Sequence, residues 1–171
     1  FTPSTAQLHD GTVANYISVT GGVFTDLYGN LNISSSQFIW TRDTKRPEIT
    51  IVSTTTDAWG QAITPQNFTT NNTSIELTFT TTEETTDFIN SSINLSGGTL
   101  GALTTSSDNK VFTATFTPSG SVTDGSAVNN ISVLGNKFTD HVGNYNIASD
   151  VFNWSMDTEH PQIIITAKNI L

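Results

Sequence analysis

The chain of 171 residues carries 15 acidic and only 6 basic side chains, which gives a formal net charge of −9 at pH 7. Because nucleic-acid binding needs a basic surface that releases counterions, this balance argues against a nucleic-acid partner. No apolar run approaches the roughly 20 residues of a membrane span. The absence of cysteine excludes disulfides and thiolate chemistry.

The clearest pattern in the sequence is an internal repeat. FTDLYGNLNISSSQFIWTRDTKRPEITI, which begins at Phe24, returns at Phe138 as FTDHVGNYNIASDVFNWSMDTEHPQIII. Self-similarity at a fixed spacing, here about 114 residues, is typical of an array built from one module. The opening FTPS at Phe1 also matches FTPS at Phe116, so Phe1 is expected to lie in the middle of a module. We therefore expect the chain to be a window onto a longer polymer.

The repeat predicts three parts. Residues 1–46 are expected to be the C-terminal part of one repeat, residues 47–160 a complete repeat, and residues 161–171 the first strand of the next. A repeat of about 114 residues has the usual size of a two-layer β-sandwich domain.

Composition favours strands over helices along the whole chain. Thr, Ser, Asn and Gly are abundant, and no segment of about eleven residues or more shows helical periodicity. Alternating apolar and polar residues instead predict short strands separated by turn-rich stretches. In chain order they are PEITIV (47–52), SIELTFT (74–80), FINSSINLSGGTL (88–100), VFTATFTP (111–118), NNISV (129–133) and VFNWSMD (151–157). Such a series predicts an all-β, antiparallel sandwich.

Five blocks then follow one another in the complete repeat: FTTTEETTDF (79–88), GTL (98–100), FTATFTP (112–118), FTDHVGN (138–144) and Asp-Thr-x-x-Pro (157–161). Their order resembles the bacterial immunoglobulin-like repeats of large surface adhesins and other giant extracellular proteins. The first block departs from the Phe-Ser-Glu of that family, because three threonines follow Phe79. The resemblance implies seven-stranded immunoglobulin-like sandwiches repeated head to tail, with a role in reach and cell-surface attachment and no enzymatic activity.

Two functions are compatible with the residues. Repetition, low charge and the lack of a catalytic cluster indicate a structural module of an extracellular stalk, fibre or filament, whose partners are neighbouring repeats. The alternative is an adhesion module that binds cell-surface glycans or a protein through end loops near Trp59 or Thr85–Ile89. No catalytic residue is predicted, because nothing that would activate a histidine surrounds His9, His141 or His160.

Aspartate and asparagine recur at each expected junction between repeats. They are Asp26, Asn30, Asn32 and Asp43 in the first copy, and Asp140, Asn144, Asn146 and Asp157 in the second. Calcium takes six to eight oxygen ligands from carboxylates, amides and backbone carbonyls, so these loops are candidate calcium sites. The same pattern is also turn chemistry, in which Asp caps a turn while Gly and Asn tolerate positive φ. Both interpretations remain open.

Two other groups of side chains are interpreted as structural. The alternating aromatic residues of the terminal strand are assigned to the core rather than to a sugar-stacking platform. They are Phe38, Trp40, Phe152 and Trp154. A second acidic loop, with Glu83, Glu84 and Asp87, is interpreted as solvated surface.

Eight Asn-x-Ser/Thr sequons are candidates for N-glycosylation. They begin at Asn32, Asn67, Asn71, Asn72, Asn90, Asn94, Asn130 and Asn153. Glycans are expected if the source is eukaryotic, which the sequence does not decide.

An incomplete repeat that ends near Arg46 would expose Phe24, Phe38 and Trp40 to water unless further strands complete it. We favour one continuous giant chain as the source of those strands. The alternative is a polymer of subunits in which the C-terminal QIIITAKNIL (162–171) adds a strand to another chain.

Overall fold

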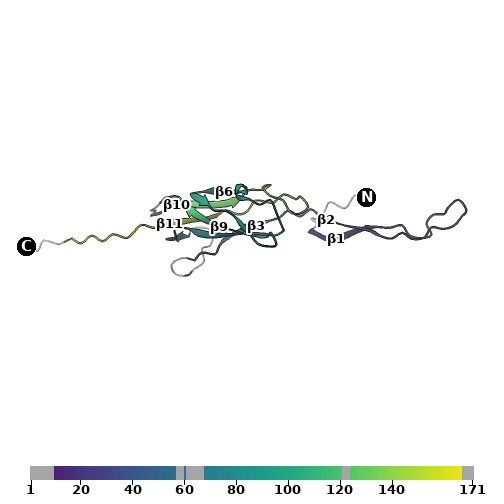
Figure 1. Ribbon diagram of the computed structural model, residues 1–171, viewed down its shortest axis with the longest axis horizontal. Helices are drawn as coiled ribbons and strands as arrows, with labels where there is room; N and C mark the ends of the chain where they lie inside the picture. The colour runs from purple at the N-terminus through teal and green to yellow at the C-terminus, as the bar shows by residue number, and fades with distance from the viewer. Residues whose placement is uncertain (1–9, 57–59, 61–67, 121–123, 167–171) are drawn as a thin grey trace, which may run out of the picture. The chain divides into compact units, whose positions relative to one another are not determined.

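The computed structural model describes residues 10–56, 60, 68–120 and 124–166 (Figure 1). The chain divides into two compact units, Phe1–Arg46 and Pro47–Leu171, and each is described by itself. Among the described residues the only helical segment is a 3₁₀ turn at Asn90–Ser92, and no helix there is long and apolar enough to cross a membrane. The all-β prediction is confirmed.

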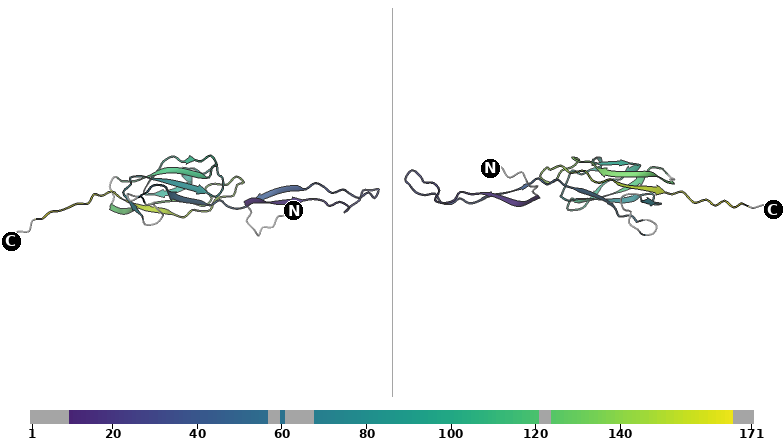
Figure 2. Two further views of the ribbon diagram at one scale, coloured as in Figure 1. Left: turned by 90° about the horizontal axis from the view of Figure 1, so that it is seen from below. Right: turned by 180° about the vertical axis from the view of Figure 1, so that it is seen from behind.

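Two β-sheets form the second unit. One sheet has the strand order β3-β5-β9-β7, with β8 also paired to β9, and the other has the order β4-β11-β10-β6. Their bounds are β3 (Ile49–Ser53), β4 (Thr69–Thr70), β5 (Ile75–Thr81), β6 (Ile93–Ser96), β7 (Gly98–Leu100), β8 (Thr104–Thr105), β9 (Val111–Pro118), β10 (Asp124–Val133) and β11 (Phe152–Asp157). Figure 2 shows the two sheets as facing layers, the arrangement of a β-sandwich.

The predicted strands are confirmed where alternation is strong. VFTATFTP coincides with β9 and ends at Pro118, and SIELTFT coincides with β5 to within one residue. FINSSINLSGGTL divides into the 3₁₀ turn, β6 and β7. The sequence did not predict β4 or β8, which have two residues each, nor the parallel pairing of β4 with β11 in an otherwise antiparallel fold.

Aromatic side chains fill the space between the two sheets. The Phe88 ring lies at the centre of one group, with centroids 5.0 Å from Phe112, 5.3 Å from Phe138 and 5.7 Å from Phe79. At the other end of the core the rings of Phe116 and Trp154 meet edge to face. The buried apolar side chains of the core are Ile49, Ile51, Ile75, Leu77, Phe79, Phe88, Ile93, Phe112, Phe116, Ile131, Val133, Phe138, Phe152 and Trp154. The core prediction for Phe152 and Trp154 is therefore confirmed.

The described part of the first unit is a hairpin of β1 (Asp10–Ile17) and β2 (Phe38–Asp43) with a long connecting loop. Its register matches that of β10 and β11, because Asn15 lies opposite Trp40 just as Asn129 lies opposite Trp154. Both hairpins also have an irregularity of register, after Asp10 and Asp124 respectively.

The apolar face of the first hairpin is not buried. Phe38 is 67% exposed and Ile17 51% exposed, whereas Phe152 and Ile131 at the matching register positions are 1% and 0% exposed. The core prediction is therefore wrong for Phe38, because the first unit has no second sheet among its described residues. The expectation that an incomplete repeat exposes Phe24 and Phe38 is confirmed. Trp40 is half-buried.

Gly98 provides a test of the close packing between β7 and β9. A Cβ atom at Gly98 would lie closer than 3.0 Å to the Thr117 carbonyl oxygen and the Phe116 ring. We expect Gly98→Ala to lower the unfolding free energy by about 1–3 kcal/mol in urea titrations, the usual cost of overpacking a core.

Gly101→Ala is the matched control, because a Cβ there would come no closer than 3.4 Å to the Thr115 carbonyl oxygen. Equal unfolding free energies of the two variants would contradict the close packing of Gly98 against β9.

Candidate functional site

The FTD-x-x-Gly-Asn segment of the second unit is a loop that Asp140 closes. The Oδ1 atom of Asp140 accepts hydrogen bonds from the backbone N–H groups of Val142 and Asn144, both at 2.9 Å. Its Oδ2 atom accepts one from Asn144 Nδ2 at 2.8 Å. Gly143 has a φ of 95°, a backbone conformation that favours glycine, and its N–H donates back to the Asp140 carbonyl. Asp140 and Asn144 are thus brought together as the sequence predicted.

Asn146 ties the base of the same loop together. Its Oδ1 atom accepts hydrogen bonds from the N–H groups of Lys137 at 2.7 Å and Phe138 at 3.1 Å. Its Nδ2 atom donates to the carbonyls of Leu134 and Ile147. The side chain is fully buried. Because an amide oxygen has two lone pairs and both are used here, Asn146 acts as a structural clamp rather than as an open ligand.

The same network is present in the first unit, 114 positions earlier in the sequence. Asp26 accepts hydrogen bonds from the N–H groups of Tyr28 and Asn30 and from Asn30 Nδ2. Asn32 accepts from the N–H groups of Val23 and Phe24 and donates to the carbonyls of Thr20 and Ile33. The loop therefore keeps its geometry whether or not a sandwich core lies beneath it.

Asp43 and Asp157 have a different task from Asp26 and Asp140. Asp157 ends β11 and accepts a hydrogen bond from Glu159 N at 3.0 Å, and Asp43 ends β2 and accepts one from Lys45 N at 3.0 Å. Each carboxylate thus caps the chain as it leaves a strand, which is the turn interpretation of these residues.

The acidic loop before the 3₁₀ turn is more structured than its sequence suggested. The Asp87 carboxylate accepts hydrogen bonds from Thr139 N at 2.9 Å, Thr139 Oγ1 at 3.0 Å and Thr85 Oγ1 at 2.7 Å. Asp87 therefore joins this loop to the Asp140 loop, 52 positions away in sequence. The interpretation as solvated surface is confirmed for Glu84 and Asp87, which are exposed, and is wrong for Glu83, which is half-buried. Asp87 also has a structural role through its bonds to Thr139.

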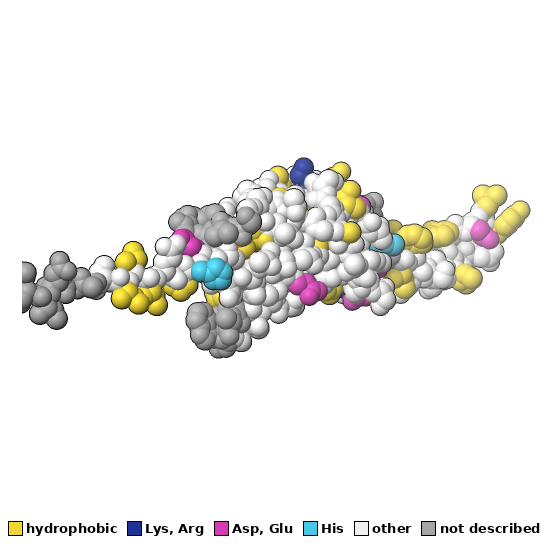
Figure 3. Space-filling view, turned by 60° about the vertical axis from the view of Figure 1, so that its left-hand side comes forward, with side chains coloured by type: hydrophobic (Ala, Val, Ile, Leu, Met, Phe, Trp, Pro, Cys, Tyr) yellow, Lys and Arg dark blue, Asp and Glu magenta, His cyan; other side chains and the backbone are white. Residues whose placement is uncertain are grey.

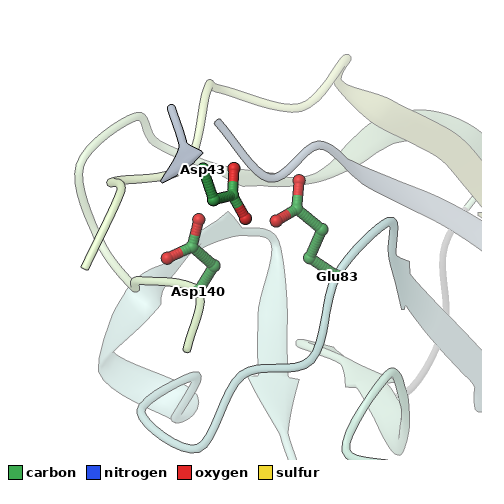
Figure 4. A group of neighbouring side chains, drawn as sticks. All are labelled: Asp43, Glu83 and Asp140. Atoms are coloured by element: carbon green, nitrogen blue, oxygen red, sulfur yellow. The ribbon is translucent and has the colours of Figure 1, made fainter. Parts of the chain in front are cut away.

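Glu83 and Asp140 bring two acidic groups together at this end of the second unit. An oxygen of each carboxylate lies within 4.8 Å of the other (Figure 4), and Asp140 is only 6% exposed. Asp43, which Figure 4 also labels, belongs to the first unit. Sequence spacing did not indicate Glu83 as a candidate ligand, because no spacing rule connects it to the FTD loop.

An open, polar hollow of about 430 Å³ lies beside these groups. It is lined by Glu84, Thr85, Thr86, Thr139, Asp140, His141, Val142 and Gly143. It includes the start of the Thr85–Ile89 loop that was considered for ligand binding. Trp59, Asn67 and His9 lie outside the described residues.

The pKa values reflect the hydrogen bonds of the two loops. Burial alone would raise the pKa of Asp140, but the hydrogen bonds from Asn144 and Val142 outweigh it and hold the pKa below the ordinary value of 3.8. Likewise burial would raise the pKa of Asp87, and the donors on Thr139 and Thr85 lower it. The pKa of Asp26 is lowered, mainly by the Asn30 side chain and backbone. These carboxylates are therefore fully ionised acceptors at neutral pH.

No arrangement for nucleophilic catalysis is seen in the described part of the chain. His141 and His160 are exposed, and neither makes a hydrogen bond there to a carboxylate or hydroxyl. Fold and loops together define an immunoglobulin-like β-sandwich.

The chain belongs to the bacterial Ig-like domain family, whose model matches residues 43–156. No curated protein and no solved structure matches it. The resemblance to bacterial immunoglobulin-like repeats is thus confirmed at the level of the domain. Domains of this family are structural or adhesion-type modules, are generally non-catalytic and commonly occur in surface proteins.

Asp140→Asn tests the role of the Asp140 carboxylate. We expect the substitution to lower the unfolding free energy at pH 7 by about 2 kcal/mol, the size of a hydrogen bond to a charged group. Because the pKa of Asp140 is lowered in the folded state, this stabilisation is complete above the ordinary pKa of 3.8 and is lost as the pH falls through the folded-state pKa. The difference between wild type and variant should therefore shrink in acid.

Urea titrations between pH 7 and pH 2 measure this difference. Asp26→Asn, in the exposed copy of the loop, is the matched control and should leave the main unfolding transition unchanged. A difference for Asp140→Asn that stays constant into acid would contradict the role of the charge.

Proposed function

We propose that the chain is a non-catalytic, structural part of a tandem array of Ig-like sandwiches, which forms an extracellular stalk, fibre or filament of a large surface protein. In this proposal residues 1–46 end one repeat, residues 47–160 form a complete repeat and residues 161–171 begin the next. Neighbouring repeats are then the principal partners. The observation that carries the proposal is the recurrence of one hairpin register and one loop network in both units.

The exposed apolar face of the first hairpin supports this proposal. Its residues Ile17 and Phe38 hold the register positions of Ile131 and Phe152, which the sheet containing β5 and β9 covers in the second unit. Covering a large apolar side chain stabilises a fold by about 1.5–3 kcal/mol. A sheet related to β3-β5-β9 is the cover that fits, because it already accommodates the same residue types in the complete sandwich.

The C-terminal segment also carries apolar side chains that no second sheet covers. Ile163 and Ile165 are 88% and 92% exposed, whereas Ile49 and Ile51, at the matching positions of the repeat, are 5% and 8% exposed in β3. In the proposed array these isoleucines become the first inward-facing residues of a following sandwich. One continuous polypeptide is the arrangement that we favour, and strand donation between separate chains is the alternative.

An extended chain tests the proposal. A second copy of residues 47–115, joined in front of Phe1, supplies the sheet that we expect to cover the first hairpin. Burial of Trp40 should then shift its fluorescence emission to shorter wavelength, and binding of a hydrophobic dye should fall. When Trp40→Phe is made in both the original and the extended chain, the emission shift between them should disappear, which assigns the shift to Trp40.

The matched control is the same added copy with Phe79→Asp and Phe112→Asp, which should be unable to form the covering sheet. Unchanged Trp40 emission on addition of the intact copy would contradict the proposal.

Calcium binding at the end loops is a second part of the proposal. The Glu83 and Asp140 carboxylates lie within 4.8 Å of each other, and such close like charges favour a bound cation. Hard oxygen ligands of this kind suit calcium, and a bound ion would stiffen this end of the sandwich.

Calorimetric titration with calcium, and the thermal unfolding midpoint with and without it, measure this binding. We expect a rise in the midpoint that Glu83→Gln abolishes, with magnesium as the control ion. No heat and no shift at about 10 mM calcium, above the weakest affinities typical of extracellular modules, would contradict it.

A further inference from the structure

The sequons of this chain differ in what their side-chain amides do in the structure. An N-linked glycan replaces one of the two hydrogens on Nδ2 of asparagine, so an Nδ2 that already donates hydrogen bonds to the protein has less freedom to accept a sugar. Four sequon asparagines are committed in this way, and the groups that accept from them are known. Asn32 donates to the Thr20 and Ile33 carbonyls, Asn72 to the Thr56 carbonyl, Asn90 to the Gly101 carbonyl and Asn130 to Ser96 Oγ.

Three other sequon asparagines, Asn71, Asn94 and Asn153, make no side-chain hydrogen bond among the described residues. Two of them are also open to an enzyme. Asn71 and Asn94 are exposed, and so are the hydroxyl residues of their sequons, Thr73 and Ser96. Asn153 is half-buried, as is the Ser155 of its sequon. Within the described part of the chain, Asn71 and Asn94 are therefore the two sequon asparagines that combine a side-chain amide without a hydrogen bond and an exposed sequon.

The two positions lie on opposite edges of one sheet. Asn71 directly follows β4, Asn94 lies within β6, and the order β4-β11-β10-β6 places these two strands at the two ends of the sheet. An edge strand presents unpaired backbone groups that can pair with another chain, and proteins protect such edges with charged side chains, proline, bulges or a covering segment. On the face of the molecule that Figure 3 shows, charged side chains are sparse among the described residues.

We propose that Asn71 and Asn94 are N-glycosylation sites, and that their glycans flank the two edges of the β4-β11-β10-β6 sheet. The donor is an oligosaccharide carried on a lipid phosphate or pyrophosphate. Nδ2 of asparagine bonds to the anomeric carbon of the sugar, the bond from that carbon to the phosphate oxygen breaks, the lipid phosphate leaves, and the amide loses one proton to a base of the transferase. This proposal does not depend on the tandem array.

Glycopeptide mass spectrometry of the protein purified from its natural source tests the proposal. We expect glycan mass on Asn71 and Asn94, and unmodified Asn32, Asn72, Asn90 and Asn130. Electron-transfer fragmentation separates Asn71 from the adjacent Asn72. Unmodified Asn71 and Asn94, or glycans on the committed asparagines instead, would overturn it.

Sequon variants made in the same source give a second test. Thr73→Ala and Asn94→Gln should each remove one glycan and leave the other in place, whereas Thr73→Ser and Ser96→Thr keep both sequons and both glycans. Ser74→Ala, which removes only the sequon of Asn72, should change nothing. Circular dichroism confirms that each variant is folded, since every substituted residue is exposed. Glycan occupancy that does not follow the sequons would also overturn the proposal.

Discussion

The contact between Phe116 and Trp154 joins the two sheets of the sandwich. Phe116 comes from β9 and Trp154 from β11, and their rings meet edge to face with centroids 4.7 Å apart. Both side chains are almost completely buried, and they are accompanied by Ile75, Ile131 and Phe152 from strands of both layers. Since each sheet is apolar on one face, neither layer can hide that face without the other. The contrast between buried Phe152 and exposed Phe38 shows how strongly burial depends on the presence of both layers.

Alternation of residue types predicted most of this fold because the inward and outward faces of a half-buried strand differ in composition. It worked best for β5 and β9, where three successive inward positions are apolar: Ile75, Leu77 and Phe79 in one, and Phe112, Ala114 and Phe116 in the other. It could not predict β4 or β8, because two residues are too few to show a period. Alternation alone could not predict the exposure of Phe38, which followed instead from the repeat boundary near Arg46, since a pattern assigns a residue to a face but does not provide the layer that covers it.

The candidate site was predictable in part, for a similar reason. Asp140, Gly143 and Asn144 act within one tight turn, and turn chemistry depends on local spacing that a sequence displays. The bond from Thr139 to Asp87 spans 52 positions, and no local pattern could connect those residues. Asn146 was predicted either as a calcium ligand or as a turn residue, and its structural role became clear only because both lone pairs of its oxygen accept from backbone donors.

The clamp formed by Asp140 and Asn146 has a consequence for sequence variation. Its hydrogen bonds use backbone groups and the side chains of Asp140, Asn144 and Asn146, and none uses the side chains of the two residues that follow Asp140. Those intervening positions differ freely between the two copies, with Leu27 and Tyr28 in one and His141 and Val142 in the other. One frame can therefore display apolar, aromatic or ionisable residues at the same place. Successive copies can diverge in what they present to their surroundings while the loop that presents it stays the same.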